Sequence, residues 1–313
     1  RCRADQKIDS AATPWIKPAG YGLILSALCV AAWTLWPRFP QWDSDKLSIA
    51  IIDVGSGESI FVEFPNHETL LVDGGGFRTG SFDVGRLVVA PFLWNRGIGK
   101  IDYMAVTHSD QDHIAGLESL LKVFKVGYFL YHETAVKDPR IERLRQNAMA
   151  EQAVPLNLEI GRPMRVGEAA ITLLHPGADF ARREREKGRN RIGNSLSLAF
   201  RLDYREFSML FAADIGEKEE RYLIENRAAL RADFLKAPHH GSKFSSSPAF
   251  IRAVQPKAAF FSSGYLNPFR HPDPDVVERY RQSGARVWRT DRHGALLITT
   301  DGYAHHVRGH EDL

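Results

Sequence analysis

Cysteine is scarce in this sequence of 313 residues, and neither positive nor negative charge predominates. The two cysteines, Cys2 and Cys29, lie near the N-terminus, so the rest of the chain has neither a disulfide framework nor a thiolate metal ligand. The formal net charge of +3 is too small to indicate nucleic-acid binding by itself. Hydrophobic residues make up 44% of the chain, which is enough to build a globular core.

A second absence marks the N-terminal region, where no residue from Pro18 to Pro37 is charged. About 20 apolar residues span a bilayer, and Trp or Tyr residues lie near both ends of this segment. We therefore expect a transmembrane anchor at residues 18–37, in contact with the lipid bilayer. A cleaved signal peptide and a buried globular helix are the alternatives. The excess of Lys and Arg before the segment places the residues after it outside the cytoplasmic membrane, on the periplasmic or extracellular side.

The remaining sequence predicts one α/β domain. A Pro-punctuated linker ends at residue 46, so residues 1–46 form the anchor and linker and residues 47–313 form the domain. "LSIAIIDV" and "SIFVEF" alternate like strands, "HIAGLESLLKVF" has helical spacing, and "VWRT" with "ALLITT" predicts a closing hairpin. Two β-rich halves with helices favour two packed sheets with helices outside, a four-layer αββα sandwich. Because the first residue is Arg1 rather than Met, we expect a longer protein.

The segment "THSDQDHIAGL" places His108, Asp110, Asp112 and His113 within six positions. Imidazole and carboxylate groups together suit Zn²⁺, Mn²⁺ or Fe²⁺. The cluster lies between a predicted strand and a predicted helix, where a tight loop can direct several side chains into one space. It is either a crowded polar loop or one half of a metal site. These residues alone cannot complete a site for two ions, so such a site needs further ligands from elsewhere in the chain.

Two other strand ends carry candidate ligands. Asp214 follows the apolar run "SMLFA", and the pair His239–His240 follows "DFLKAP". Alone, Asp214 is typical of a turn or a helix N-cap, and the two histidines are as compatible with a surface loop as with a site. Functional residues gather at loops that a rigid scaffold positions. Taken with the first cluster, these residues predict a single metal centre.

These motifs resemble a known family. "HSDQDH" resembles the His-x-His-x-Asp-His signature of the metallo-β-lactamase superfamily, with Asp110 at the place of the second His. Together with "DVGSGES", "LVDGGG", "FAADI" and "PHHGSKFSSS", it resembles the C-terminal hydrolase domain of the ComEC family of competence proteins, over residues 47–300. The resemblance implies a metallo-β-lactamase fold preceded by a transmembrane helix. It also implies a metal-dependent nuclease that degrades the non-transported DNA strand during natural transformation, with DNA and the membrane channel part of the same longer chain as partners.

The resemblance also implies a ligand set for two divalent metal ions, Mn²⁺ or Zn²⁺. The first ion is assigned to His108 and Asp110, and the second to Asp112, His113 and His239, with His240 as the alternative to His239. Asp214 bridges the ions, and Asp73 and His240 support the ligands from behind. The chain departs from the family at Ala213, which replaces a Gly, and at Ser56, Gly57 and Glu58, which replace Gln-Gly-Asp. The third-motif His has no clear counterpart, and His175 or Asn194 is its candidate substitute.

Roles in catalysis are assigned on the same basis. Asp112 receives a proton from the attacking water, and His271 donates one to the leaving group, unless His271 is only fixed by its Pro-rich turn. Phosphate contacts are expected from Asn194, Ser195, Ser242 and Lys243. Two further groups are ambiguous: residues 182–191 form a solvated charged loop or a phosphate-binding arm, and His305, His306 and His310 form a solvated tail or a metal patch.

Two other functions remain compatible with the sequence. The same centre suits a phosphoesterase that acts on small or cell-wall phosphodiesters, which we would expect to have a deep and narrow pocket. A non-catalytic module that binds DNA or proteins is favoured by the missing third histidine. These hypotheses differ in two measurable properties, namely stoichiometric metal and hydrolysis of DNA.

Overall fold

The computed structural model describes residues 26, 45–77, 82–187 and 193–309. The chain divides into two units, Arg1–Pro40 and Gln41–Leu313, and all described residues except Ser26 belong to the second unit. Apart from Ser26, the expected anchor at 18–37 lies outside the described residues. Among the helices of the described part, none is both long and apolar enough to cross a membrane.

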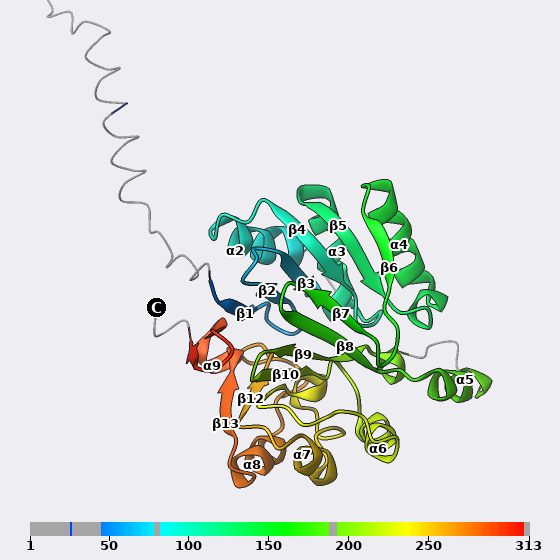
Figure 1. Ribbon diagram of the computed structural model, residues 1–313, viewed down its shortest axis with the longest axis vertical. Coiled ribbons are helices and arrows are strands. Elements are labelled where there is room, and N and C mark those ends of the chain that lie inside the picture. Colours follow the sequence, from blue (N-terminus) through cyan, green and yellow to red (C-terminus); the bar gives the residue numbers. More distant parts are fainter. Residues whose placement is uncertain (1–25, 27–44, 78–81, 188–192, 310–313) are drawn as a thin grey trace, which may run out of the picture. The chain divides into compact units, whose positions relative to one another are not determined.

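Two β-sheets form the centre of the domain (Figure 1). In the described residues, the first sheet has eight strands in the order β15-β14-β1-β2-β3-β4-β5-β6, and the second has seven in the order β13-β12-β11-β10-β9-β8-β7. The strands of the first sheet are β1 (Leu47–Ile51), β2 (Ile60–Glu63), β3 (Thr69–Val72), β4 (Lys100–Ala105), β5 (Lys125–Tyr131), β6 (Val154–Asn157), β14 (Leu296–Thr300) and β15 (His305–Arg308). Those of the second are β7 (Pro163–Val166), β8 (Ala169–His175), β9 (Ala199–Tyr204), β10 (Phe207–Phe211), β11 (Phe234–Lys236), β12 (Ala258–Phe261) and β13 (Arg286–Arg289).

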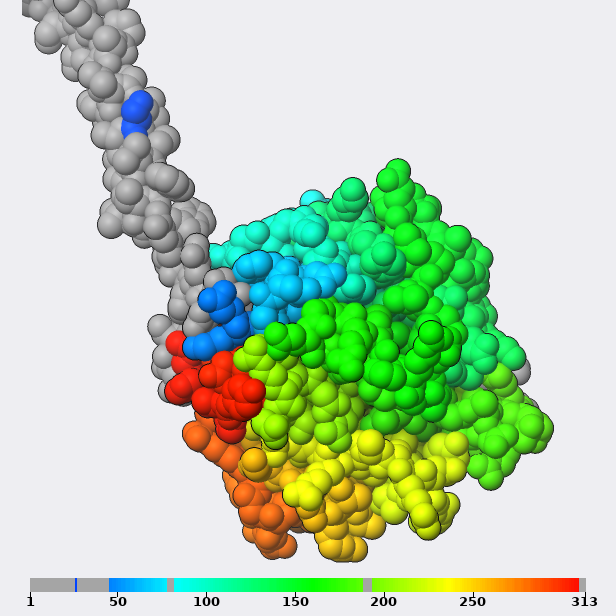
Figure 2. All heavy atoms as spheres, viewed as in Figure 1, coloured from blue at the N-terminus to red at the C-terminus, as the bar shows by residue number. Residues whose placement is uncertain are grey.

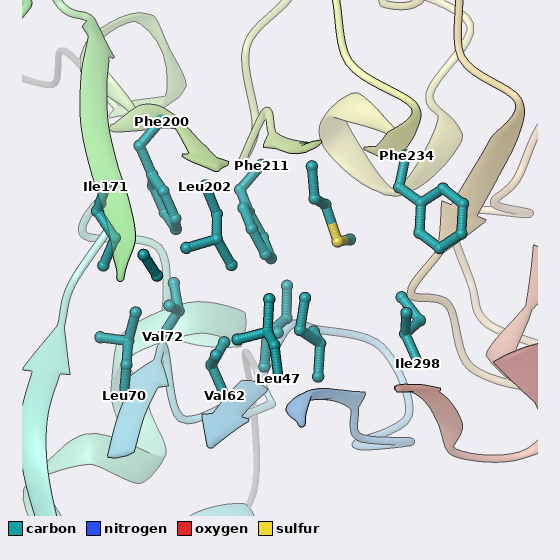
Figure 3. Close-up of a cluster of buried hydrophobic side chains, with 14 of the residues drawn as sticks. Leu47, Val62, Leu70, Val72, Ile171, Phe200, Leu202, Phe211, Phe234 and Ile298 are labelled. Carbon is teal, nitrogen blue, oxygen red and sulfur yellow. The ribbon is translucent and has the colours of Figure 1, made fainter. Parts of the chain in front are cut away.

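The inner faces of the two sheets enclose the main hydrophobic core (Figure 3). Alternate residues of a strand point to opposite faces. In β3, Leu70 and Val72 therefore face the second sheet, whereas Leu71 faces the helices. On the inner face of the second sheet, the rings of the cross-strand partners Phe200 and Phe211 stack with their centroids 4.7 Å apart. Each fully buried side chain of this size contributes ~1.5–3 kcal/mol, so this core holds the strand ends in fixed positions.

Helices cover the outer face of each sheet. The helices against the first sheet are the π-helix η1 (Gly85–Val89), α2 (Ala90–Trp94), α3 (Gln111–Val123), the 3₁₀ turn η2 (Ala135–Lys137) and α4 (Pro139–Ala150). Those against the second sheet are α6 (Glu217–Glu225), α7 (Pro248–Val254) and α8 (Pro274–Gln282). The remaining helical segments are α5 (Ala178–Glu186), η3 (Gly193–Leu196), η4 (Pro238–Gly241) and α9 (Thr290–His293). The predicted four-layer αββα arrangement is confirmed.

Two local predictions are wrong. The expected closing hairpin does not form, because β13 pairs with β12 in the second sheet while β14 crosses to the first sheet and pairs with β1. This crossing brings the red C-terminal strands beside the blue start of the domain (Figure 2). The charged stretch from Arg182 is not a loop in its first part, because it belongs to α5, where Arg182 pairs with Asp179 one turn earlier. Residues 188–192 lie outside the described part.

Candidate metal centre

Parallel strands bring the candidate residues to one edge of the sheets. β3 and β4 are parallel neighbours in the first sheet, and β10, β11 and β12 are parallel neighbours in the second. Parallel neighbours present their C-terminal ends at a common edge, where open α/β sheets bind ligands. The residues that follow these strand ends are Asp73, His108 to His113, Asp214, His239 with His240, and His271.

One half of the centre, which we call the inner half, consists of Asp112, His113, His240 and Oδ1 of Asp214. His113 Nε2 lies 3.2 Å from His240 Nε2 and 3.4 Å from Asp214 Oδ1. His240 Nε2 lies 3.5 Å from Asp214 Oδ1 and 3.8 Å from Asp112 Oδ2. Ligand atoms about 2.1 Å from a tetrahedral ion are about 3.4 Å from one another, so these spacings fit one Zn²⁺-sized cation.

The imidazoles of the inner half are held by hydrogen-bond acceptors at their Nδ1 atoms. His113 Nδ1 lies 2.7 Å from Asp73 Oδ2, and Asp73 in turn accepts hydrogen bonds from the Thr107 backbone N–H at 2.9 Å and hydroxyl at 2.6 Å. His240 Nδ1 lies 3.0 Å from the carbonyl oxygen of Ser262. Both acceptors favour the tautomer with the proton on Nδ1. In the neutral form of each ring, Nε2 therefore carries the lone pair that can bind a cation.

The other half, which we call the outer half, consists of His108, His239 and Oδ2 of Asp214. Asp214 Oδ2 lies 3.7 Å from His108 Nε2 and 3.8 Å from His239 Nε2. The His108 side chain is buried, but the side chain of His239 is 31% exposed. Asn194 Nδ2 lies 3.3 Å from His239 Nε2, so this amide contacts one of the candidate ligands of the outer half. Asp110 lines the adjoining cavity.

The donor set fits a bound cation. His108 Nε2 and Asp214 Oδ1 are buried and have no hydrogen-bond partner in the described structure, which is costly unless another group satisfies them. Burial opposes the charge on Asp214, yet the neighbouring imidazoles of His240 and His113 outweigh it and hold the pKa of this carboxyl well below its usual range. The pKa of the buried His240 is well below its usual range, mainly because of desolvation. Burial opposes the charge on His113, but Asp214 and Asp73 outweigh it and raise the pKa of this imidazole well above its usual value, so a cation that binds the inner half displaces a proton from His113.

Backbone strain accompanies the centre. His239 and His240 have φ values of 49° and 55°, and Ala213, beside Asp214, has a φ of 45°. Side-chain-bearing residues rarely adopt this left-handed region, which costs of order 1–3 kcal/mol each and occurs preferentially at functional sites. The backbone N–H of His239 donates to the carbonyl of Ala213 at 2.8 Å and so joins the two strained segments. A glycine adopts the φ of Ala213 without this strain.

A cavity of about 270 Å³ opens onto both halves. Its lining consists of Asp110, Gln111, Asp112, Arg140, Asp214, His239, His240, Phe269 and His271. The ring of His271 lies 6.0 Å from that of His239 and nearly parallel to that of Phe269. Burial and the neighbouring His239 lower the pKa of His271. The cavity therefore combines three carboxyl groups, three imidazoles, one guanidinium and one phenyl ring.

The structure distinguishes between residues that the sequence left as alternatives. His240, and not His239, lies within the inner half, because the left-handed backbone at both residues turns their side chains to different sides of Asp214. His175 does not reach the outer half. It is fully buried, its Nδ1 lies 2.9 Å from the Ser197 carbonyl oxygen, and its ring packs against Phe180.

The expected phosphate contacts are only partly assembled. Asn194 reaches His239, and Ser195 follows it in η3, but Ser195 is not part of the cavity lining. Ser242 is buried in a tight turn, and its Oγ accepts a hydrogen bond from the Phe244 backbone N–H at 3.4 Å. The Lys243 ammonium lies over the Phe244 ring, 5.1 Å from its centroid. Neither Ser242 nor Lys243 lines the cavity, so phosphate recognition there requires other residues.

Arg140 is the cation that sequence analysis missed. It lies in the first turn of α4, and its Nη2 donates to Ser109 Oγ at 2.7 Å and to Asp138 Oδ2 at 3.0 Å. Asp138 also caps the helix by accepting from the Arg140 backbone N–H. These bonds hold the guanidinium at the cavity wall. The sequence contains only a helix-start signal here, because the link between Arg140 and the centre is made in three dimensions.

A buried ion pair is a second feature that sequence analysis missed. Glu58 and Lys236 are 1% and 0% exposed and pair directly with each other. The Glu58 carboxylate also forms a group of potential ligands with Asp214 and His240, whose ligand atoms lie within 4.8 Å of one another. Burial raises the pKa of Glu58, against the opposing effect of the Lys236 ammonium. The signal for this pair was Lys236 itself, a charged residue inside the apolar run before the two histidines.

The C-terminal histidines lie away from the centre. His305 and His306 belong to the edge strand β15, where both are exposed, and the ring of His305 contacts Phe234. In the part of the chain that the structure describes, neither joins a group of three potential metal ligands. His310 lies outside the described residues.

Comparisons with known proteins agree with this fold. The family model of the Metallo-beta-lactamase superfamily matches residues 52–265. The chain is 29% identical over 285 residues to "ComE operon protein 3" of Bacillus subtilis, covering 88% of this chain and 35% of that protein. It is 27% identical over 280 residues to "Competence protein ComA" of Neisseria gonorrhoeae, covering 89% and 36%. The chain thus spans about a third of the length of these relatives.

Solved structures share the fold at low sequence identity. CmlA, a diiron beta-hydroxylase from Streptomyces venezuelae, has a TM-score of 0.53 at 16% identity, over 82% of this chain and 54% of that chain. The metallo-beta-lactamase fold protein YhfI from Bacillus subtilis has a TM-score of 0.52 at 12% identity, over 82% and 100%. At these identities the likeness concerns the fold alone.

Proposed function

Because this chain belongs to the metallo-β-lactamase superfamily, and its relatives include ComEC-family competence proteins, we propose that it is a metal-dependent nuclease. Its substrate would be DNA, and its role the degradation of the non-transported strand during natural transformation. The observation that carries this proposal is the pair of half-sites sharing Asp214, each with nitrogen and oxygen ligands, at the base of a cavity that also holds Arg140.

We assign two divalent cations, Mn²⁺ or Zn²⁺, to the two halves. Asp112, His113 and His240 would hold one ion, and His108, Asp110 and His239 the other, with Asp214 between them. Two divalent ions in such a centre lower the pKa of water and neutralise charge that develops on phosphoryl oxygens. The absence of thiolate ligands keeps Mn²⁺ as well as Zn²⁺ chemically suitable.

The chain itself contributes positioning and proton transfer. Arg140 faces the same cavity as Asp112 and is suited to a phosphate oxygen, because its guanidinium is planar and always charged. Asp112 is assigned to accept a proton from the attacking water. His271 is assigned to donate a proton to the leaving oxygen. Its lowered pKa makes the protonated ring a stronger acid, while reducing the fraction that is protonated at neutral pH.

We also propose the cellular context from the sequence and the relatives. The uncharged segment at 18–37 would anchor residues 47–313 at the extracytoplasmic face of the cytoplasmic membrane. The much greater length of the competence relatives supports a channel part within the same longer protein. The boundary near residue 46 follows from the Pro-punctuated linker.

The test is cleavage of labelled DNA by the chain with Mn²⁺ or Zn²⁺, alongside metal analysis. The double variant Asp112→Ala/His113→Ala should lose both cleavage and bound metal. The matched control is Asp179→Ala/His306→Ala, which removes the same residue types at exposed positions outside the cavity. Undiminished metal-dependent cleavage by the first variant would show that the centre is not the active site.

The cavity volume favours one second candidate. About 270 Å³ accommodates one phosphodiester group with small substituents, as expected for an enzyme that acts on small or cell-wall phosphodiesters. An assay of the same chain on bis(p-nitrophenyl) phosphate and on DNA separates the two functions by their relative kcat/KM. Binding of DNA without hydrolysis or stoichiometric metal would instead identify a non-catalytic DNA-binding module.

A further inference from the structure

The loop between β12 and α8 closes one side of the metal cavity, and we call residues 264–271 the rim loop. The Asn267 side chain holds this loop in shape. Its Nδ2 donates to the carbonyl oxygens of Gly264 at 2.9 Å and His271 at 2.6 Å, and its Oδ1 accepts from the His271 backbone N–H at 2.9 Å. Three hydrogen bonds from one amide make the rim loop a preorganised element rather than a loose connection.

The base of the rim loop is packed against the first sheet. A Cβ atom at Gly264 would lie 2.9 Å from the carbonyl carbon of Gly55 and from the backbone nitrogen of Ser56, so no side chain fits there. Gly55 belongs to the loop that follows β1. The rim loop is thus fixed at its base by close backbone packing and across its width by Asn267.

This fixed loop displays large apolar side chains at its surface. Tyr265 and Leu266 are 79% and 85% exposed, and Phe269 is 47% exposed. Exposed apolar groups on an ordered loop beside a cavity are typical of a binding surface. Phe269 lines the metal cavity itself, and its ring is nearly parallel to that of His271, with 21° between planes and 5.9 Å between centroids. An aromatic face therefore lies within the same cavity as the metal-ligand groups.

We propose that the rim loop is a stacking platform for the unpaired bases of a nucleic-acid single strand whose phosphate occupies the metal cavity. This inference rests on the proposed nuclease function and adds the substrate class. Every base has a π-face, so stacking on Phe269 and Tyr265 binds a strand without regard to its sequence. The bases of an intact duplex are already stacked and paired, which makes them poor partners for these rings. The exposed Arg270, between Phe269 and His271, adds a positive charge for the strand backbone.

The experiment compares two strands that differ only in their bases. The chain is assayed with Mn²⁺ on an ordinary single-stranded oligonucleotide and on a strand of the same length made of abasic residues. Base stacking contributes ~1–3 kcal/mol per base, so the Phe269→Leu variant should lower the ratio of kcat/KM for ordinary over abasic strand by about 5- to 150-fold, mainly through KM. Phe269→Tyr keeps a flat ring and should keep the ratio. Tyr265→Ala should lower the ratio in the same direction.

The control variant and the results that would contradict the proposal are judged by the same ratio of kcat/KM for ordinary over abasic strand. Tyr303→Ala removes a tyrosine that is 71% exposed in the turn before β15 and should leave the ratio as in the unaltered chain. If Phe269→Leu and Tyr265→Ala both keep the ratio, the stacking platform is wrong although the nuclease function stands. A rim loop that contacts lipid or another protein predicts this result. If the unaltered chain cleaves neither strand with Mn²⁺ or Zn²⁺, the nuclease function itself fails, and the stacking inference fails with it.

Discussion

The two halves of the metal centre share one carboxylate but differ in the protein that surrounds them. In the inner half, His113 Nδ1 is hydrogen-bonded to the buried Asp73, and His240 Nδ1 to a backbone carbonyl oxygen. In the outer half, His239 is partly exposed, and its Nε2 is in contact with the Asn194 amide instead of facing a free site. The hydrogen-bond partner of the ring nitrogen that does not bind the metal fixes the tautomer and orientation of a metal-binding imidazole. Both imidazoles of the inner half are therefore held in place, whereas in the outer half only His108 is held, with its Nδ1 2.9 Å from Thr107 Oγ1, and His239 has to rearrange around a cation.

This difference leads us to expect unequal affinities for the two ions. A cation that enters the inner half finds three ligand atoms, His113 Nε2, His240 Nε2 and Asp214 Oδ1, already 3.2–3.5 Å from one another. A cation in the outer half must displace the Asn194 contact and order the side chain of His239. We therefore expect the occupancy of the outer half to depend on the metal concentration.

The pair of variants His240→Ala and His239→Ala provides the largest contrast. His240→Ala removes a ligand of the preorganised half and should weaken the tighter ion by more than about 100-fold, beyond the 10- to 100-fold typical of lost supporting residues. His239→Ala should leave the tighter ion within about 10-fold and mainly weaken the second. Isothermal titration with Zn²⁺ measures both steps. If His239→Ala had the larger effect on the tighter ion, our comparison of the halves would be reversed.

A smaller effect is expected from Asp73→Asn. An amide cannot accept from His113 Nδ1–H and from both Thr107 donors as a carboxylate does, so the affinity of the tighter ion should fall about 10- to 100-fold. The matched control is Asp102→Asn. Asp102 accepts from the backbone and hydroxyl of Thr69 in the same manner but lies on β4, at the opposite end of that strand from the centre. An equal loss in both variants would indicate general destabilisation of the fold.

Much of the fold follows from patterns in the sequence. The alternation in residues 47–64 and the apolar strand before His108 specify which faces are buried, and two β-rich halves require the face-to-face packing that forms the core. The predicted hairpin after Val287 failed for a physical reason. Pattern shows that β13 and β14 are strands, but not that one ends the second sheet and the other joins β1 of the first.

The sequence predicts which segments meet at the centre, but not the directions in which individual side chains point. The spacing of His108, Asp110, Asp112 and His113 predicts that they converge, because they connect a strand end to the first turn of α3. The choice between His239 and His240 depends on left-handed backbone angles that neither residue type encodes. Ser242 seemed suited to phosphate by its position beside Gly241, but the turn buries it. Arg140 and Phe269 enter the cavity from segments whose local sequence carries no metal-site signal.

The buried His175, which supports the outer half, leads us to expect a pH dependence of the stability of the fold. His175 holds the segment of Asn194, because its Nδ1 bonds the Ser197 carbonyl oxygen and the Ser197 N–H donates to Asn194 O at 3.1 Å. Burial lowers the pKa of His175 from 6.5 to about 4, so the folded chain keeps this ring neutral while the unfolded chain protonates it below pH 6.5. The free energy of unfolding should therefore fall as the pH drops below 6.5, by about 2 kcal/mol at pH 5, with the loss complete near pH 4.

Urea denaturation in the presence of a chelator at pH 7 and pH 5 measures this loss. The His175→Gln variant cannot titrate, so its stability should fall by about 2 kcal/mol less than that of the unaltered chain over the same interval. His306→Gln is the matched control, because His306 is exposed; its loss should equal that of the unaltered chain. If His175→Gln loses as much stability as the unaltered chain, His175 is not a neutral buried support. The exposure of His239 would then be the remaining reason for expecting a weaker metal affinity in the outer half.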